Sequence, residues 1–350
     1  MFRHRVPGTP IGIIRIPIQL SECPAGAFPR AEESGVVIQP TPKRAAAPST
    51  AADTPPKCST EDWYSRDVNS VQDARLRIAA IGFLNPAPLM WDFEHPPLDA
   101  VLARRYRIDR MSPSECAARL AAGTADIGLI PIAALAANPG LRILPGCTIA
   151  SKGRVRSLLL VRRANQPLSA LRSVAADTAS RTTVAYTRIL FHKWGNAAVP
   201  FLPMAADLDP MLDRADAAIV IGDPALLALE ERSNRFERTG EELVYHDLAE
   251  EWRSITGLPF VSAVWGIAHG CPLDESIAED FVQSRDHGLE NIETLVAEWS
   301  GKFPIPESTI RSYLTANIHY VLDQECIEGM RGFFRMAEET GVLPKYALAI

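Results

Sequence analysis

Long apolar runs and blocks of basic residues are absent from this sequence of 350 residues. Pro, Gly or Arg interrupts each of the longest apolar candidates, so none reaches the length that crosses a membrane. The net charge is −6 and Lys and Arg form no cluster. The sequence therefore indicates neither a membrane nor a nucleic acid as partner.

Paired cysteines and cofactor motifs are missing as well. The six cysteines are widely scattered, with no CxxC pair and no metal-ligand spacing. This usage predicts isolated reduced thiols in a cytoplasmic protein, without a disulfide framework. No phosphate-binding glycine loop occurs, so we expect neither a cofactor nor a metal.

The N-terminal part differs in composition from the rest. Pro, Ala, Ser and Thr dominate Gln39–Thr60, which cannot bury enough apolar surface to offset its ordering entropy. We interpret residues 1–74 as a disordered extension. A targeting peptide is the alternative, because Ile11–Leu20 resembles a signal-peptide core. Arg15 and Pro17 interrupt that core, however, and no small-residue cleavage site follows.

From Arg75 onward, short apolar runs alternate with helical patterns, which is typical of a parallel sheet flanked by helices. Leu76–Ile81 and Asp126–Pro131 are expected strands. Ser112 is an expected helix N-cap, with Pro113 at the first helical position and Glu115 at the third. The fold class is therefore α/β.

The chain is long enough for two domains, and 47% of its residues are hydrophobic. A second unit is expected to begin near Ser173. The composition of Phe260–Ala268 predicts a strand by which the chain returns to the first unit. One unit interrupted by another predicts two lobes with a ligand cleft between them. We expect the first lobe over 75–170 and 263–350 and the second over 171–262.

The segment Ile81–Leu89, IGFLNPAPL, places Asn85 where a strand breaks into a loop. Such junctions hold ligands in α/β proteins, because the carboxyl ends of the strands open onto a crevice. An amide both donates and accepts, so Asn85 suits a carboxylate, a hydroxyl or an ether oxygen. The alternative is a turn asparagine that bonds its own backbone.

Seven segments in order resemble the chorismate dehydratase family of the futalosine route to menaquinone, whose fold is that of a type II periplasmic binding protein. Asn85, Ser151, Gly153 and Ser157 match the family pattern. The chain departs from it at Gly82, Pro86 and Arg154, where Ser, Ala and Pro are more common. The segments are GFLNPAPL (82–89), PSECAARLAAGTADIGLIPIAAL (113–135), IASKGRVRSLLLV (149–161), DTASRTTVAYTRILF (177–191), AAIVIGDPAL (217–226), DLAEEWRSITGLPFVSAVW (247–265) and YLTANIHYVLDQECIEGMRGFFRMAEETGVLP (313–344).

The resemblance implies a hydro-lyase that acts on chorismate as a monomer or homodimer. Chorismate carries two carboxylates, a ring hydroxyl and an enolpyruvyl ether, and loss of water makes its ring aromatic. The protein then needs mainly to hold the dianion and assist the leaving hydroxide. The resemblance allows a substrate carboxylate to remove the proton while Asn85 and Ser151 orient the substrate. The expected substrate-binding residues are Gly153, Arg154, Val155, Ser157, Ser180, Arg181, Thr182, Thr183 and Asp223.

Structural roles compete with several of these assignments. A helix starting near Arg181 would favour a carboxylate at its N-terminus, but Ser180 and Thr182 are equally suited to N-capping. Asp223 lies in a Gly-Asp-Pro sequence that is typical of a helix start.

The sequence shows no histidine–carboxylate pair suited to act as the base. His192 falls on the outer face of an expected helix, and the adjacency of His246 and Asp247 is weak evidence. Trp252 and Trp265 are expected to pack in the core or at the hinge.

Two other functions fit the same fold. One is a solute-binding protein for an anionic metabolite, which a secretory signal would favour. The other is the related dihydroxynaphthoate synthase of the same pathway. The LNPAPL and SKGRVRS segments favour the dehydratase.

Overall fold

The computed structural model describes residues 74–272 and 274–348. The predicted N-terminal extension, its alternative as a targeting peptide, and Cys23 and Cys58 lie outside this part. The described cysteines, Cys116, Cys147, Cys271 and Cys326, are all unpaired. Among the described helices, none combines the length and the apolar character needed to cross a bilayer.

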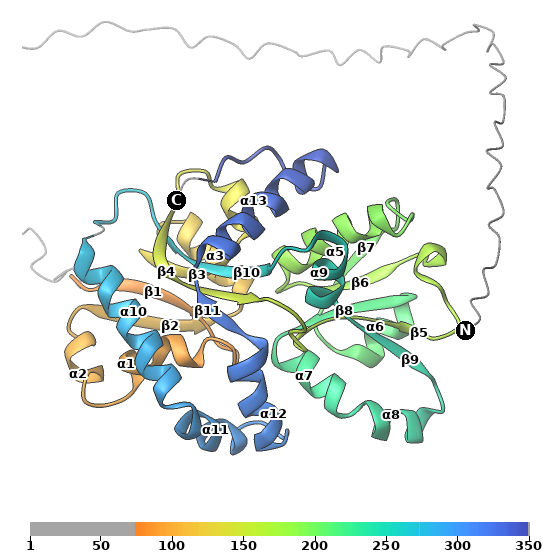
Figure 1. Ribbon diagram of the computed structural model, residues 1–350, viewed down its shortest axis with the longest axis horizontal. Coiled ribbons are helices and arrows are strands. Elements are labelled where there is room, and N and C mark those ends of the chain that lie inside the picture. The colour runs from red at the N-terminus through yellow and green to blue at the C-terminus, as the bar shows by residue number, and fades with distance from the viewer. Residues whose placement is uncertain (1–73, 273, 349–350) are drawn as a thin grey trace, which may run out of the picture. The chain divides into compact units, whose positions relative to one another are not determined.

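The first lobe is built on a six-stranded sheet of order β11-β4-β10-β3-β1-β2 (Figure 1). Strands β1, β2 and β3 are parallel as predicted, whereas β10, β4 and β11 join antiparallel, so the sheet is mixed. The bounds are β1 Leu76–Ile81, β2 Tyr106–Met111, β3 Ile127–Pro131, β4 Arg142–Ser151, β10 Phe260–Ile267 and β11 His319–Val321.

The helices of the first lobe come from both ends of the described chain. The predicted cap of α3 is confirmed, because Ser112 and Glu115 form a reciprocal capping box. Helix α10 lies close to η1, since a Cβ on Gly288 would stand 2.1 Å from the carbonyl oxygen of Pro88. The bounds are η1 Ala87–Met90, α1 Trp91–Glu94, α2 Asp99–Leu102, α3 Pro113–Ala121, α4 Ala133–Ala137, α10 Glu275–Glu290, α11 Ile292–Ser300, α12 Glu307–Ser312, η3 (a π-helical turn) Tyr313–Asn317 and α13 Gln324–Glu339.

The second lobe is built on a five-stranded sheet of order β7-β6-β8-β5-β9, in which β6 is parallel to β7 and β8. Its strands are β5 Leu158–Arg163, β6 Val174–Asp177, β7 Phe201–Met204, β8 Ala217–Ile221 and β9 Leu243–Asp247. Its helices are η2 Leu168–Ala170, α5 Arg181–Lys193, α6 Leu208–Arg214, α7 Asp223–Glu230, α8 Arg232–Thr239 and α9 Leu248–Thr256.

The predicted boundary at residue 170 is wrong. Strand β5 belongs to the second sheet, where Leu158 pairs with Ile221, so the chain crosses between Ser151 and Leu158. An apolar run shows that a strand is buried but not which sheet it joins, because pairing is decided by partners distant in sequence. The return crossing falls between β9 and β10, close to the expected position.

An aromatic cluster joins the lobes. Tyr186 of α5 stacks on Phe260 of β10 at 3.8 Å and meets Trp252 of α9 edge-on. The hydroxyl of Tyr186 accepts a hydrogen bond from the Val261 amide at 3.3 Å. Trp252 and Trp265 are fully buried, which confirms their predicted place in the core. Burying this much aromatic surface fixes α5 against the first sheet.

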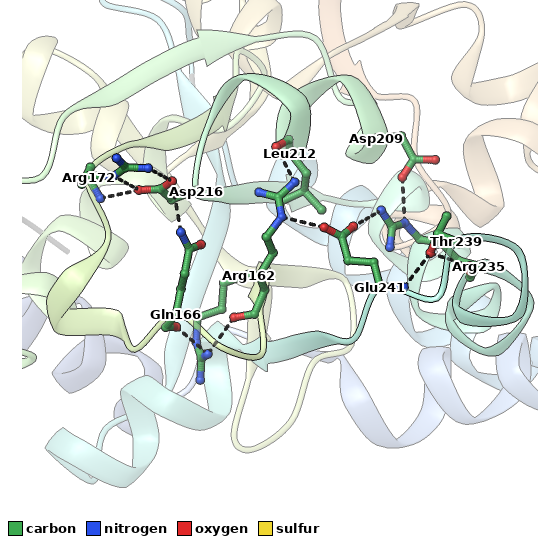
Figure 2. A network of polar contacts seen from close by, with 10 residues as sticks. Arg162, Gln166, Arg172, Asp209, Leu212, Asp216, Arg235, Thr239 and Glu241 are labelled. Carbon is green, nitrogen blue, oxygen red and sulfur yellow. Dashed lines mark hydrogen bonds and ion pairs between the residues drawn. The ribbon is translucent and has the colours of Figure 1, made fainter.

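An ion-pair network lies in the second lobe (Figure 2). The Glu241 carboxylate accepts from Arg163 at 2.6 Å and from Arg235 at 2.8 Å, and Arg235 also donates to Asp209 at 2.7 Å. Arg163 ends β5, whereas Leu158, which begins β5, lines the cavity described below. The network and the cavity thus lie at opposite ends of one strand.

Candidate functional site

A cavity of about 50 Å³ lies between the two lobes. Of the predicted site residues, it brings together Asn85, Val155, Ser157, Ser180, Arg181, Thr182 and Thr183. The other lining residues are Ile81, Phe83, Pro113, Pro131, Ile149, Leu158, Ala179, Ile221, Gly222, Ser262, Ala263 and Ile318. The walls are therefore mostly apolar, with a few polar groups that point at a common space, as in small-molecule sites.

Asn85 lies in the loop between β1 and η1, so the predicted break from strand to loop is confirmed. Its Oδ1 atom is buried without a hydrogen-bond partner. This oxygen does not make the local turn bond that was the alternative interpretation. A buried amide oxygen left unpaired is costly, so it marks a place where a ligand donor or a water belongs.

Four consecutive residues at the N-terminus of α5 line the cavity. Ser180 is at the N-cap position, yet its hydroxyl makes no capping bond, and its buried oxygen has no partner. The Thr182 hydroxyl accepts from the Ala133 amide of the first lobe at 3.1 Å. Simple N-capping by these two side chains is thus not observed. The free amides of α5 and the exposed Arg181 make this end suitable for an anion.

Three predicted residues of the first crossing do not line the cavity. The Ser151 hydroxyl donates to the Gly153 carbonyl at 2.9 Å and accepts from the Gly153 amide at 3.3 Å. These bonds shape the turn itself. Arg154 points outward and pairs with Glu250 at 2.8 Å on the surface.

Asp247 holds the rest of this crossing in place. Its buried carboxylate accepts from the Val155 amide at 3.0 Å and from the Arg156 amide at 2.6 Å, and it caps α9. Arg156 adopts a left-handed backbone, with φ of 67°. These bonds direct Val155 and Ser157 into the cavity. Asp247 stands out in the sequence only as the neighbour of His246, so this role could not be predicted.

Asp223 begins α7 after Gly222, so the helix-start interpretation holds. In addition, its carboxylate accepts from the Leu84 amide of the first lobe at 3.0 Å. Burial raises the pKa of Asp223 to about 6, and the Leu84 bond opposes that shift. Asp223 is therefore a half-buried link between the lobes, placed next to the cavity rather than in its wall.

Sequence reasoning missed several cavity residues, above all Phe83. Its ring lies so close to Gly222 that a Cβ there would stand 2.6 Å from it, and Gly222 has a φ of 65°. The signal was present as a glycine that directly follows the apolar strand β8. Ser262 and Ile318 gave no signal, because they come from a strand interior and from a turn far along the chain.

Histidine–carboxylate pairs do occur, but away from the cavity. His246 contacts Glu251 at 2.9 Å, and His287 contacts the buried Asp92 at 2.9 Å. Their partners come from other elements, which the sequence could not show. His192 is exposed on α5 as expected. Within residues 74–272 and 274–348, the cavity wall contains no histidine and no carboxylate.

One group of described residues has metal-ligand types in reach of each other, namely His319, Asp323 and Cys326. The carboxylate of Asp323 is already paired with the Lys152 ammonium at 2.6 Å and caps Cys326 at 2.9 Å. This group is outside the cavity wall, and it stabilises the start of α13.

Two sheets with a cavity between them define a protein of the periplasmic-binding-protein fold. A protein from Archaeoglobus fulgidus matches with a TM-score of 0.60 at 14% identity, over 78% of this chain and 100% of that chain. A Candida albicans protein described as having the generic periplasmic binding protein fold matches with a TM-score of 0.53 at 13% identity. That match covers 78% of this chain and 92% of that chain.

The chain belongs to the family described as menaquinone biosynthesis, which matches residues 76–339. It is 26% identical over 238 residues to the chorismate dehydratase of Thermus thermophilus, covering 65% of this chain and 85% of that protein. The resemblance drawn from the seven segments is confirmed.

Proposed function

We propose that this protein is a chorismate dehydratase. It eliminates water from chorismate to give 3-(1-carboxyvinyloxy)benzoate in menaquinone biosynthesis. Its family and its dehydratase relative support this function. The observation that carries it is the cavity between the lobes, where the Asn85 and Ser180 oxygens are buried without partners.

One substrate carboxylate binds at the N-terminus of α5 in this proposal. Ser180, Arg181 and the free amides there supply donors and positive charge to an otherwise apolar cavity. Hydrogen bonds in which one partner is ionised are about twice as strong as neutral ones. This end of α5 therefore fixes the orientation of the ring in the cavity.

Asn85 accepts a hydrogen bond from the ring hydroxyl through its unpartnered Oδ1 and so orients the leaving group. The ring proton is removed and its bonding pair forms the new ring double bond, while the carbon–oxygen bond breaks with its pair on the hydroxyl. The hydroxide and the proton together leave as water. Because the described cavity wall holds no carboxylate and no histidine, we assign proton removal to a carboxylate of the substrate. Ser151 remains a predicted catalytic residue, and Gly153, Arg154 and Asp223 remain predicted binding residues.

Substrate entry requires the lobes to separate. A cavity of about 50 Å³ has room for a few waters, since one water needs about 10–15 Å³ of such space. A ring with two carboxylates needs far more room. The bond between the Leu84 amide and Asp223, which joins the lobes beside the cavity, is one that must open.

The same proposal places the enzyme in the cytoplasm, as a monomer or homodimer that needs no cofactor. Scattered reduced thiols and the biosynthetic family support the location. Aromatisation of the ring drives the loss of water, which is the reason for proposing a reaction without a cofactor.

Incubation of the purified protein with chorismate tests the function. We expect chorismate to be consumed and a product lighter by one water to accumulate, detected by liquid chromatography and mass spectrometry. Binding of chorismate without turnover would instead support a solute-binding protein. Inertness toward chorismate together with turnover of a cyclic futalosine product would support the dihydroxynaphthoate synthase.

A further inference from the structure

Tyr313 is a fully buried tyrosine whose hydroxyl reaches the wall of the cavity. It begins η3, the π-helical turn that follows α12. Its hydroxyl donates to the Ser157 hydroxyl at 2.8 Å, and Ser157 lines the cavity. Single π-helical turns are rare and occur frequently at functional sites.

This bond determines what Ser157 can offer a ligand. A serine hydroxyl has one hydrogen and two acceptor positions. Because the Ser157 oxygen accepts from Tyr313, its own hydrogen is directed elsewhere, and no other side-chain partner of this oxygen is found in the described chain. Ser157 therefore acts as a donor toward the cavity, whereas Asn85 presents an unpartnered acceptor.

The turn that carries Tyr313 holds the first crossing at a second point. Asn317, at the other end of η3, donates to the Arg154 carbonyl at 3.0 Å. The crossing is thus fixed on both sides of Val155, which lines the cavity. Burial raises the pKa of Tyr313, so the phenol stays protonated, while hydrogen bonds with Ser157 and Asn85 oppose the shift.

We propose that Tyr313 is a positioning residue that commits Ser157 to donate a hydrogen bond to an acceptor oxygen of the substrate. The inference rests on the proposed function and adds which groups of its site donate hydrogen bonds to the substrate and which accept them. An acceptor oxygen, from the ether or a carboxylate, lies at Ser157, and the ring hydroxyl lies at Asn85. Without Tyr313 the Ser157 hydroxyl rotates freely and its hydrogen is no longer directed at the substrate.

A double-mutant cycle with Tyr313→Phe and Ser157→Ala tests this coupling. Tyr313→Phe retains the buried ring and removes the hydroxyl, with its bonds to Ser157 and Asn85. We expect each single variant to lower kcat/KM about tenfold, as for the loss of one hydrogen bond. The double variant should be no worse than Ser157→Ala alone, because Tyr313 acts through Ser157. If the two losses in kcat/KM multiply in the double variant, the inference is overturned.

Tyr106→Phe is the matched control. Tyr106 is equally buried, in the first lobe, and its hydroxyl donates to Asp280 at 2.6 Å away from the cavity. It should cost similar stability and leave kcat/KM unchanged. If Tyr313→Phe behaves like this control, Tyr313 is merely structural and the inference fails. If Tyr313→Phe does not fold, Tyr313→Met, with an adaptable apolar side chain, replaces it in the cycle.

The outcomes separate this inference from the proposed function. A wild-type protein that does not dehydrate chorismate overturns the function itself. An active wild-type protein with multiplicative losses in the cycle overturns only the role of Tyr313.

Discussion

The two ends of β5 differ in how their polar groups are paired: ion pairs dominate at one end, although Gln166 Oε1 and Arg235 Nη1 are buried there without partners, and the other end lines a cavity. At the Arg163 end, the carboxylate of Glu241 is shared between two arginines, and Asp216 accepts three bonds from Arg172 (Figure 2). At the Leu158 end, the cavity contains the Asn85 and Ser180 oxygens without partners. Paired groups stabilise the fold, whereas unpaired buried groups cost stability unless a ligand satisfies them.

Two carboxyl groups show the same contrast in their pKa values. Bonds from Arg172 lower the pKa of Asp216 to about 2, while burial raises that of Asp223 to about 6. A favourable charged partner dominates at the first site, and desolvation dominates at the second. The network thus stabilises the ionised form of its carboxyl groups. Near the cavity, a ligand can still bind the unpaired oxygens and a proton can still bind Asp223.

Replacement of Asn85 should give the largest effect. Asn85→Ala removes the amide that orients the ring hydroxyl, and misplacing a reacting group by about 1 Å costs about 10² in rate. The unfolding free energy should change less than the activity, because the lost oxygen has no partner and the amide gives up only its bond with Tyr313. Steady-state kinetics with chorismate and urea unfolding measure the two effects.

Gln166→Ala is the control for Asn85→Ala. Gln166 is an amide of the network that donates to Asp216 at 3.3 Å. This change should leave kcat and KM as they are. Near-normal turnover in a folded Asn85→Ala variant would contradict the catalytic assignment and remove the contrast between the two ends of β5.

The carboxyl group of Asp223 should make the free energy of unfolding decrease as the pH rises. Its folded pKa of about 6 lies above its ordinary value of 3.8, so its contribution is complete below about pH 4. That contribution is lost as the pH rises through 6. Relative to Asp223→Asn, which retains an acceptor for Leu84, the wild-type protein should lose about 3 kcal/mol at most over this interval. Urea unfolding at a series of pH values measures the difference.

Asp216 has the opposite sign in the same experiment. Its folded pKa of about 2 lies below 3.8, so its stabilisation is present above pH 4 and is lost as the pH falls toward 2. The unfolding free energy of Asp216→Asn should therefore differ from that of the wild-type protein by a constant amount between pH 5 and 7. A constant difference for Asp223→Asn as well would show that Asp223 is not desolvated.

Loss of Glu241 should affect stability but not turnover. Glu241→Ala leaves the buried Arg235 with Asp209 alone and removes the partner of Arg163. We expect a loss of about 2 kcal/mol in unfolding free energy, with kcat and KM unchanged. Glu237→Ala, an exposed position on α8, is the control and should be neutral. A large fall in kcat for Glu241→Ala would show that the two ends of β5 are coupled.

Ser180→Ala should give the smallest effect. It removes a donor to a carboxylate that is held equally in the ground and transition states, so KM should rise several-fold with kcat unchanged. Stability should be equal or slightly higher, because the removed hydroxyl has no partner. Ser173→Ala deletes the network hydroxyl that accepts from the Asp216 amide. This control should lower stability alone. An unchanged KM for Ser180→Ala would argue against anion binding at α5.

Local patterns predicted much of the fold and part of the site. The capping box at Ser112, the strands β1 and β3 and the start of α5 follow from signals within a few residues. Strands β4, β9 and β11 were missed. Asn85 and Ser180 were found because each follows or begins an element, where side chains are free to face a ligand.

Contacts between residues far apart in the chain could not be predicted from the sequence. Tyr313 meets Ser157, and Asp223 meets Leu84, across separations of 156 and 139 residues. Nothing in the local pattern around either residue indicates its partner. The same applies to β5, whose apolar residues suit either sheet until β8 and β9 pair with it.

The sequence by itself determined the α/β class, the family, and the residue types at the strand-to-loop junctions. These depend on short-range periodicity, capping and turn chemistry. Only the tertiary structure decided which junctions face one cavity, which oxygens remain unpaired there, and which carboxyl groups are desolvated. Those properties depend on packing between elements far apart in the chain, because burial and hydrogen-bond satisfaction are set by neighbours in space.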